Sequence, residues 1–159
     1  MNELEINNDL DWRSSHLKSI FLNYKKAPRF EECFTKLESL YAIEHVLLVD
    51  LCLDHLKFWL DELGIQTRII KLSDLSISGK KSDLILNICK YTGAHKYISG
   101  ALGKDYLNIP SFHECGIELE FQQYRNPVYS QLWGEFKPYL SIVDFWMNTD
   151  QFELIWREC

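Results

Sequence analysis

The sequence predicts an α/β fold, in which a helical N-terminal part is followed by βαβ units that form a small, mostly parallel sheet flanked by helices. Apolar residues recur at three- and four-residue spacing in the first part, which is typical of amphipathic helices. Short alternating and β-branched runs come later, between further helical segments. All seven glycines lie at Gly64 or beyond, so turns are concentrated in the second part.

A chain of 159 residues favours one domain. No internal repeat or low-complexity stretch divides it. We therefore expect a single domain over residues 1–159, with a helical part at about 9–64 and a strand-containing part at about 65–159.

Three helices are expected in the helical part. The first begins near Asp9 or Asp11, since either residue is a good N-cap, and the second begins after Pro28. The third and most apolar helix covers about 43–63, and Gly64 ends it. Because this helix carries two apolar rows, we expect it to pack against a sheet or between other helices.

Short strands are expected at four places. Residues 67–72 (T-R-I-I-K-L) are rich in β-branched side chains, and residues 117–124 begin with the alternating pattern I-E-L-E-F. A third strand is expected at 95–99, and a short edge strand at 4–6. The strands after the helical part would build the sheet.

Helices are predicted between these strands, one at 82–91 and a short one that opens with the capping box S-x-x-E at 111–114. Strands separated by helices form βαβ units, whose strands run parallel. In such sheets, ligands bind beyond the carboxyl ends of the strands. The loops expected at those ends are 73–82 and 99–108, which are therefore the first places to look for a site.

The charge and hydropathy patterns exclude several classes of partner. Lys and Arg number 17 against 23 Asp and Glu, a net charge of −6, and no basic stretch indicates a nucleic-acid or anionic-membrane surface. Apolar runs reach four residues, as at 46–49, whereas a membrane-spanning helix needs roughly 18. No charged-then-apolar leader follows Met1, so secretion is not expected.

The cysteines and histidines predict no metal site, and we identify no cofactor. Five cysteines are spaced at least 19 residues apart, which excludes a C-x-x-C motif, and the histidines show no H-E-x-x-H spacing. Cys52 and Cys89 fall on apolar helical faces and are expected to be buried. The odd number of cysteines favours a reducing compartment, so we expect a cytoplasmic protein.

A first candidate site is the glycine-bearing loop after the strand at 95–99. Gly100 and Gly103 would let backbone N–H groups approach an anion, and Lys104 would add a positive charge. The spacing G-x-x-G-K matches neither a P-loop nor G-x-G-x-x-G. The segment is therefore either an anion-binding loop or a simple turn with a solvated lysine.

A second candidate site is segment 126–148, which is dense in aromatic, proline and polar residues. The polar side chains that would form a substrate rim are Tyr129, Gln131 and Asn148. Ser141 and Asp144 have a structural alternative, because Ser at N-cap and Asp at N3 form an S-x-x-D capping box at the start of the last helix. Asp144 is thus either primarily a helix cap or a general base.

These two segments resemble the signatures of the WbqC-like protein family. Residues 93–107 match G-A-x-x-Y-x-S-G-x-x-G-x-x-Y-L, and residues 127–148 match P-x-Y-x-Q-x-x-G-x-F-x-P-x-L-S-x-x-D-x-x-x-N. The signatures occur in the expected order, and weaker similarity extends over nearly the whole chain. The resemblance adds functional weight to the matched residues Ser99, Gly100, Gly103, Tyr106, Tyr129, Gln131, Ser141, Asp144 and Asn148.

The resemblance implies a bacterial cytoplasmic protein of O-antigen or other surface-polysaccharide biosynthesis. It implies a transferase that moves glycine or another aminoacyl unit onto a sugar-linked substrate, with Asp144 as the candidate catalytic residue and the other matched residues binding substrate. The alternative is a non-catalytic nucleotide-sugar-binding or assembly module, or an inactive fragment of a longer protein. Family members usually carry an additional N-terminal region with Q-P-x-Y-x-P-W, so we expect a truncated chain whose missing region is covered by a protein partner or an oligomer.

Overall fold

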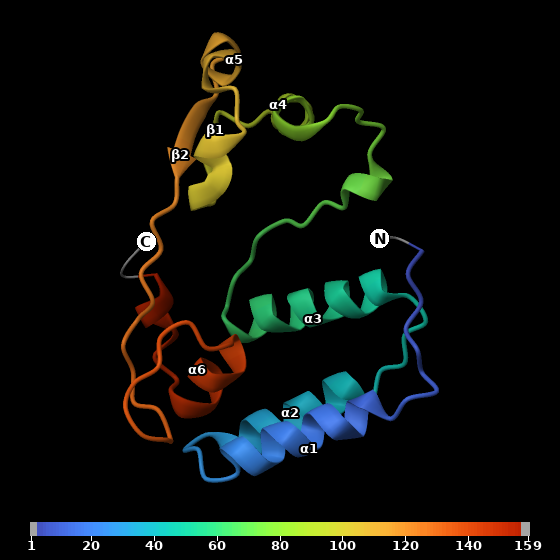
Figure 1. The fold of residues 1–159 in the computed structure, drawn as a ribbon, viewed down its shortest axis with the longest axis vertical. Coiled ribbons are helices and arrows are strands. Elements are labelled where there is room, and N and C mark those ends of the chain that lie inside the picture. The colour runs from blue at the N-terminus through green and yellow to red at the C-terminus, as the bar shows by residue number, and fades with distance from the viewer. Residues whose placement is uncertain (1–2, 157–159) are drawn as a thin grey trace. The chain divides into compact units, whose positions relative to one another are not determined.

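The computed structural model describes residues 3–156, which form two units (Figure 1). The first unit contains the residues up to Arg68 together with those from Asn126 onward. The second unit contains the residues from Ile69 to Arg125. Helices and strands are both present, as the α/β prediction requires. The assignment of one domain to the whole chain stays a prediction.

The first unit is helical, and it contains the three helices expected from the sequence (Figure 1). A short helix, α6, comes from the far end of the chain and packs against α2. The helical segments of this unit are α1 (Trp12–Tyr24), α2 (Phe30–Tyr41), α3 (Leu48–Glu62), α6 (Ile142–Asn148) and the 3₁₀ turn η3 (Phe152–Ile155).

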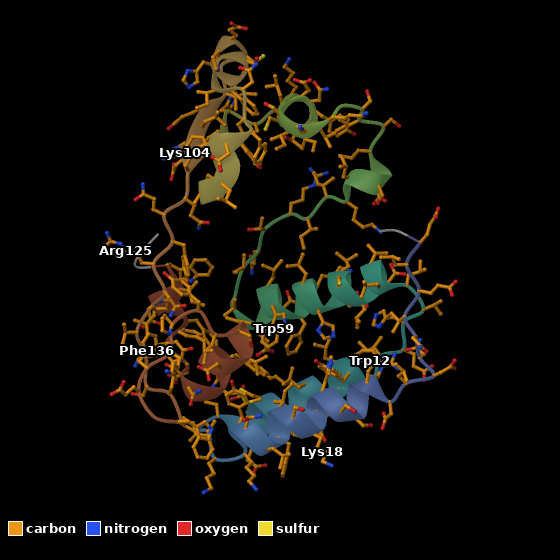
Figure 2. The ribbon with its side chains drawn as sticks, in the orientation of Figure 1. Trp12, Lys18, Trp59, Lys104, Arg125 and Phe136 are labelled. Carbon is orange, nitrogen blue, oxygen red and sulfur yellow. The ribbon has the colours of Figure 1, made fainter. Side chains whose placement is uncertain are left out.

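The core of the first unit is built around α6. Trp146 and Met147 are fully buried against the apolar face of α2, which contributes Cys33 and Leu37. The Trp146 ring lies 5.2 Å from the ring of Trp59 on α3, which Figure 2 labels. Buried aromatic pairs of this kind add about 0.5–1.5 kcal/mol beyond the area that they bury. The core therefore fixes α6 at a defined place among the other helices.

The third helix differs from its prediction in two ways. It begins at Leu48 rather than near residue 43, because the amide of Ile6 donates to Val46 O and the amide of Leu48 donates to Leu4 O. The edge strand expected at 4–6 is reduced to a single bridge between Glu5 and Leu47.

The burial expected for the third helix is also wrong. None of its residues is buried, and Cys52 is exposed. Phe58 and Trp59 pack partly against the core, while Leu56 is 46% exposed. An apolar pattern indicates a surface suited to burial, but the described part of the first unit contains no sheet that covers this face.

The second unit contains a small parallel sheet with helices packed on it (Figure 1). Strand β1 pairs with β2, with Lys96 opposite Glu118 and Ser99 opposite Phe121. The sheet and its helices share a core made by Leu86, Cys89, Leu107, Phe112 and Ile117. The elements of this unit are η1 (Leu72–Asp74), α4 (Lys81–Thr92), β1 (Lys96–Ser99), η2 (Ala101–Asp105), α5 (Ile109–Glu114) and β2 (Glu118–Phe121).

Two local predictions for the second unit are wrong. Residues 67–72 form no strand, because none of the other described segments pairs with them, and Ile69 and Ile70 are each 39% exposed. The helix expected to be capped by Ser111 begins two residues earlier, at Ile109, since Pro110 suits the first turn of a helix. The sheet therefore contains one βαβ unit rather than several.

Candidate functional site

The start of α6 gives the candidate site its geometry. Ser141 caps the helix, because its Oγ accepts a 3.2 Å hydrogen bond from the amide of Val143, as the sequence predicts. Asp144 lies in the first turn and is only 5% exposed. Its carboxylate does not complete the predicted capping box, since its hydrogen bonds among the described residues come from other side chains. The cap of α6 is therefore Ser141 alone.

Four side chains from three parts of the first unit converge on Asp144. Tyr129 Oη donates to Oδ2 at 2.7 Å, and Gln131 Nε2 donates to the same oxygen at 3.0 Å. Tyr24 Oη, from the last turn of α1, donates to Oδ1 at 3.0 Å. Asn148 Nδ2 donates to the Asp144 carbonyl at 2.8 Å and lies 3.4 Å from Oδ1. A buried carboxylate is thus satisfied by neutral donors, and no basic group pairs with it within residues 3–156.

The two tyrosines of this network stay protonated at neutral pH. Burial, the hydrogen bond to Asp144 and the charge of that carboxylate together raise the pKa of Tyr24 to about 12. The pKa of Tyr129 is raised for the same reasons, in the same order, while Gln131 acts against the rise. Each phenol therefore acts as a neutral hydrogen-bond donor to Asp144, not as a tyrosinate nucleophile.

Gln131 connects the network to the loop that precedes α6. Its Nε2 donates to the carbonyl of Lys137 at 2.9 Å, and its Oε1 accepts from the amide of Lys137 at 2.7 Å. The side-chain amide of Gln131 thus both donates to and accepts from the backbone of Lys137, like two paired residues in neighbouring strands. The backbone at Lys137 is therefore tied to Asp144 through the Gln131 side chain.

A cavity of about 540 Å³ lies beside this network in the first unit. Tyr129 and Asn148 line it, and both also donate to Asp144, so the network forms part of the cavity wall. The volume falls in the range of small-molecule sites. The lining residues are Pro28, Arg29, Val128, Tyr129, Ser130, Asn148, Thr149, Asp150, Gln151 and Leu154.

Arg29 is the basic residue of the cavity lining, and its guanidinium is already occupied. Nη1 donates to the carbonyls of Trp146 at 3.0 Å and Thr149 at 3.3 Å. Nη2 lies 3.2 and 3.1 Å from the two carboxylate oxygens of Glu32. The group also lies over the ring of Phe152 at 5.3 Å. Arg29 therefore ties the end of α6 to the start of α2 and is not an open anion site.

The glycine-bearing loop lies in the second unit, and Gly103 is required there by packing. A Cβ on Gly103 would clash with the side chain of Ser99, which is 2% exposed. The amide of Gly103 is already engaged, since it donates to Gly100 O at 2.9 Å. Lys104, which Figure 2 labels, has its Nζ 5.3 Å from the centre of the Phe121 ring. This geometry favours the interpretation of a tight turn over that of an anion-binding loop.

The structure thus divides the predicted site residues between the two units. Ser99, Gly100, Gly103 and Tyr106 lie in the second unit, where Tyr106 is 47% exposed. The first unit brings together Tyr129, Gln131, Ser141, Asp144 and Asn148 around the start of α6.

Sequence reasoning missed several residues of this region, among them Tyr24, Arg29 and Asp150. A signal existed for Tyr24, because a tyrosine on the apolar side of a predicted helix needs a partner for its hydroxyl when it is buried. Arg29 and Asp150 carried no signal, since they meet the cavity only through the tertiary fold. No group of three metal-ligating side chains occurs within residues 3–156, and no helix of that range is long and apolar enough to cross a membrane.

The chain belongs to the WbqC-like protein family, whose model matches residues 1–154. It is similar to "Uncharacterized protein Rv1507c" of Mycobacterium tuberculosis (strain ATCC 25618 / H37Rv), with 32% identity over 143 residues. That alignment covers 87% of this chain and 61% of the relative, so the chain spans about three fifths of the relative's length. No solved structure matches the chain with significance. The family expected from the two signatures is confirmed.

Proposed function

We propose that this WbqC-like protein binds a sugar-linked substrate of bacterial surface-polysaccharide assembly in the cavity beside Asp144. The observation that supports this most is the chemistry of the cavity lining, where hydroxyl and amide side chains from Tyr129, Ser130, Asn148, Thr149 and Gln151 meet in about 540 Å³. Sugars present hydroxyl groups that both donate and accept, and side chains of these types match them. The four free cysteines of the described chain are consistent with a cytoplasmic location, which is part of the proposal.

The reaction that we propose is transfer of glycine or another aminoacyl unit onto the sugar. A hydroxyl or amine of the acceptor attacks the carbonyl carbon of an activated aminoacyl donor. A new ester or amide bond forms, the bond to the leaving group breaks, and the acceptor's proton passes to a base. The family resemblance supports this reaction, and the cavity supports the sugar as the molecule that is held.

Asp144 acts in this proposal as a positioning residue rather than as the general base. Its two carboxylate oxygens already accept hydrogen bonds from Tyr24, Tyr129, Gln131 and Asn148, so side-chain donors occupy them. Tyr129 Oη donates to Asp144 and also accepts a 3.3 Å hydrogen bond from Gln131 Nε2, so these two residues fix the phenol at the cavity wall. The role of general base stays the alternative for Asp144.

A second candidate is a non-catalytic binding or assembly module that works with a protein partner or a second copy. The saturation of Asp144 by neutral donors favours it, because the candidate base is then a structural group. The loops that bind the sugar in the first proposal would do so here without a chemical step.

Mass spectrometry of reaction mixtures tests the first proposal. The chain is incubated with amino-sugar nucleotides and an activated glycine, alone and extended by the N-terminal region of a longer family member. A product heavier by one glycyl unit is expected, and Tyr129→Phe should lower its yield. The matched control is Tyr91→Phe, because Tyr91 lies on α4 and is 63% exposed. Absence of product from both proteins across the panel would contradict the transferase proposal.

Thermal-shift measurements separate the two candidates. A ligand present at 100 times its dissociation constant stabilises a protein by about 2.7 kcal/mol, so a sugar ligand should raise the melting temperature in both cases. Stabilisation without transfer, together with a stable protein complex, favours the binding module. No shift with any sugar or nucleotide sugar would contradict sugar binding, and a stable complex with another protein would then favour the assembly module over the enzyme.

A further inference from the structure

Acidic side chains outnumber basic ones around the cavity, which affects the charge of the ligand that it can bind. Arg29 is neutralised by Glu32, whose two carboxylate oxygens lie 3.2 and 3.1 Å from its Nη2. Asp150 lines the same cavity, is exposed, and forms no ion pair among the residues that the structure describes. Asp144 lies behind the lining residues Tyr129 and Asn148, which donate to it, and no basic group of residues 3–156 pairs with it. The groups in and directly behind the cavity wall, with Glu32 counted against Arg29, therefore carry an excess of negative charge.

We propose that Asp150 is a specificity-determining residue, which selects ligands that carry a protonated primary amine beside hydroxyl groups. The inference rests on the proposed binding of a sugar-linked substrate and narrows it to amine-bearing substrates. An ammonium group would be attracted to Asp150 and would feel the field of Asp144, whereas a carboxylate or phosphate would be repelled by both. The hydroxyls and amides of the lining are left for the hydroxyl groups of the ligand.

The other groups that could recognise a charged ligand in this cavity already have hydrogen-bond partners. The backbone carbonyl of Asp150 already accepts from the amide of Phe152 at 2.9 Å, so the carboxylate is the group of this residue that is available. Arg29 has both terminal nitrogens occupied, by backbone carbonyls and by Glu32, so it offers a carboxylate ligand no free fork. The recognition of charge is thus assigned to Asp150.

Ligand-observed NMR titrations with three small probes test this assignment. Glucosamine carries a protonated amine at pH 6, N-acetylglucosamine carries a neutral amide, and glucose carries a hydroxyl at that position. An exposed ion pair is worth up to about 1 kcal/mol, so we expect glucosamine to bind about three- to fivefold more tightly than N-acetylglucosamine. Raising the salt concentration should reduce this ratio, because exposed charges are screened.

Asp150→Asn should bring the ratio close to one while leaving the affinity for glucose unchanged. Asp150→Glu should keep the preference, and Asp50→Asn, at an exposed position on α3, is the matched control that should leave it intact. Equal affinities for the three sugars in the unmodified protein, or a preference that survives in Asp150→Asn, would overturn the assignment and leave sugar binding standing. Failure of all three sugars to bind would overturn the proposed function itself, and this inference with it.

Discussion

Tyr129 Oη lies 2.7 Å from Oδ2 of Asp144, and this hydrogen bond joins the loop before α6 to the helix itself. The bond is short, as charge-assisted O–H···O⁻ bonds are, and it is shielded because Asp144 is 5% exposed. Gln131 donates to the same oxygen, so one carboxylate holds two residues of the second signature. The spacing of these residues in the sequence therefore reflects a shared hydrogen-bond acceptor.

Replacing Asp144 should cost far more stability than the loss of a helix cap. Asp144→Ala leaves the hydroxyls of Tyr24 and Tyr129 without their acceptor, whereas Gln131 Nε2 still donates to Lys137 O, and each unsatisfied buried donor costs about 1–3 kcal/mol. We expect a loss of about 3 kcal/mol or more, measured by urea unfolding. Asp144→Asn, which keeps one acceptor oxygen, should lose less.

The control for this measurement is Asp61→Ala, at an exposed position on α3, which should change the free energy of unfolding by no more than about 0.5 kcal/mol. A loss below about 1 kcal/mol for Asp144→Ala would show that the network contributes little to folding. In that case the stabilising role of Asp144 would be wrong.

The tyrosine network also predicts a loss of stability in alkali. The pKa of Tyr24 is about 12 in the folded protein and about 10 when the chain is unfolded, so the folded state binds the proton more tightly. This contribution to stability is complete below about pH 10. It falls as the pH rises from about 10 to about 12, because the unfolded chain has then released a proton that the folded chain retains.

Urea unfolding between about pH 9 and pH 11.5 measures this effect. Each proton that the folded state retains adds about 1.4 kcal/mol per pH unit to the decrease in the free energy of unfolding. Tyr24→Phe should therefore show a shallower decrease with pH than the unmodified protein. Tyr91→Phe is again the control, since Tyr91 is 63% exposed. Equal slopes for Tyr24→Phe and the unmodified protein would contradict the assignment.

The sequence predicted helices more reliably than strands, for a physical reason. The helices at α1, α2 and α4 form their hydrogen bonds within one segment, so apolar spacing and local signals locate them well. A strand needs a partner, and residues 67–72 find none among the described segments despite their β-branched side chains. The strands β1 and β2 were predicted correctly because each meets the other in a βαβ unit.

The site could be predicted only as far as its residues carried a local or family signal. Tyr129, Gln131 and Asn148 were selected as polar residues of one segment, and all three converge on Asp144. Tyr24 lies 120 positions from Asp144 in sequence, so no spacing rule could pair them. The capping box failed for a related reason, because tertiary donors compete with the local amide for the Asp144 carboxylate.

Ser141 should behave as an ordinary helix cap. Its Oγ accepts the amide of Val143, so Ser141→Ala should lower the free energy of unfolding by about 0.5–2 kcal/mol, and Ser141→Asp should retain most of the stability. Ser14→Ala, at an exposed position on α1, is the matched control. Chemical denaturation of the three variants checks this expectation, and a Ser141→Ala protein as stable as the control would exclude a capping role.

Gly100 and Gly103 in the second unit offer a test between a tight turn and an anion-binding loop. A Cβ on Gly103 would meet the Ser99 side chain and would lie 3.2 Å from Leu107 Cδ1. Overpacking of this kind costs about 1–3 kcal/mol, so Gly103→Ala should be clearly destabilised. Gly100 has φ −62°, and nothing lies within 4 Å of a Cβ placed there, so Gly100→Ala should be neutral or slightly stabilising.

Thermal and urea unfolding of the two variants measure this difference, and a double mutant identifies its cause. Ser99→Gly removes the side-chain atoms that the new Cβ of Gly103→Ala would meet. In the Ser99→Gly background, Gly103→Ala should therefore lower the free energy of unfolding by less than it does alone. Additive losses in the double mutant would show that Ser99 is not the obstacle. If inorganic phosphate raises the melting temperature of the unmodified protein but not that of Gly100→Ala, the anion-binding loop is favoured. A tight turn without an anion site predicts no such stabilisation by phosphate.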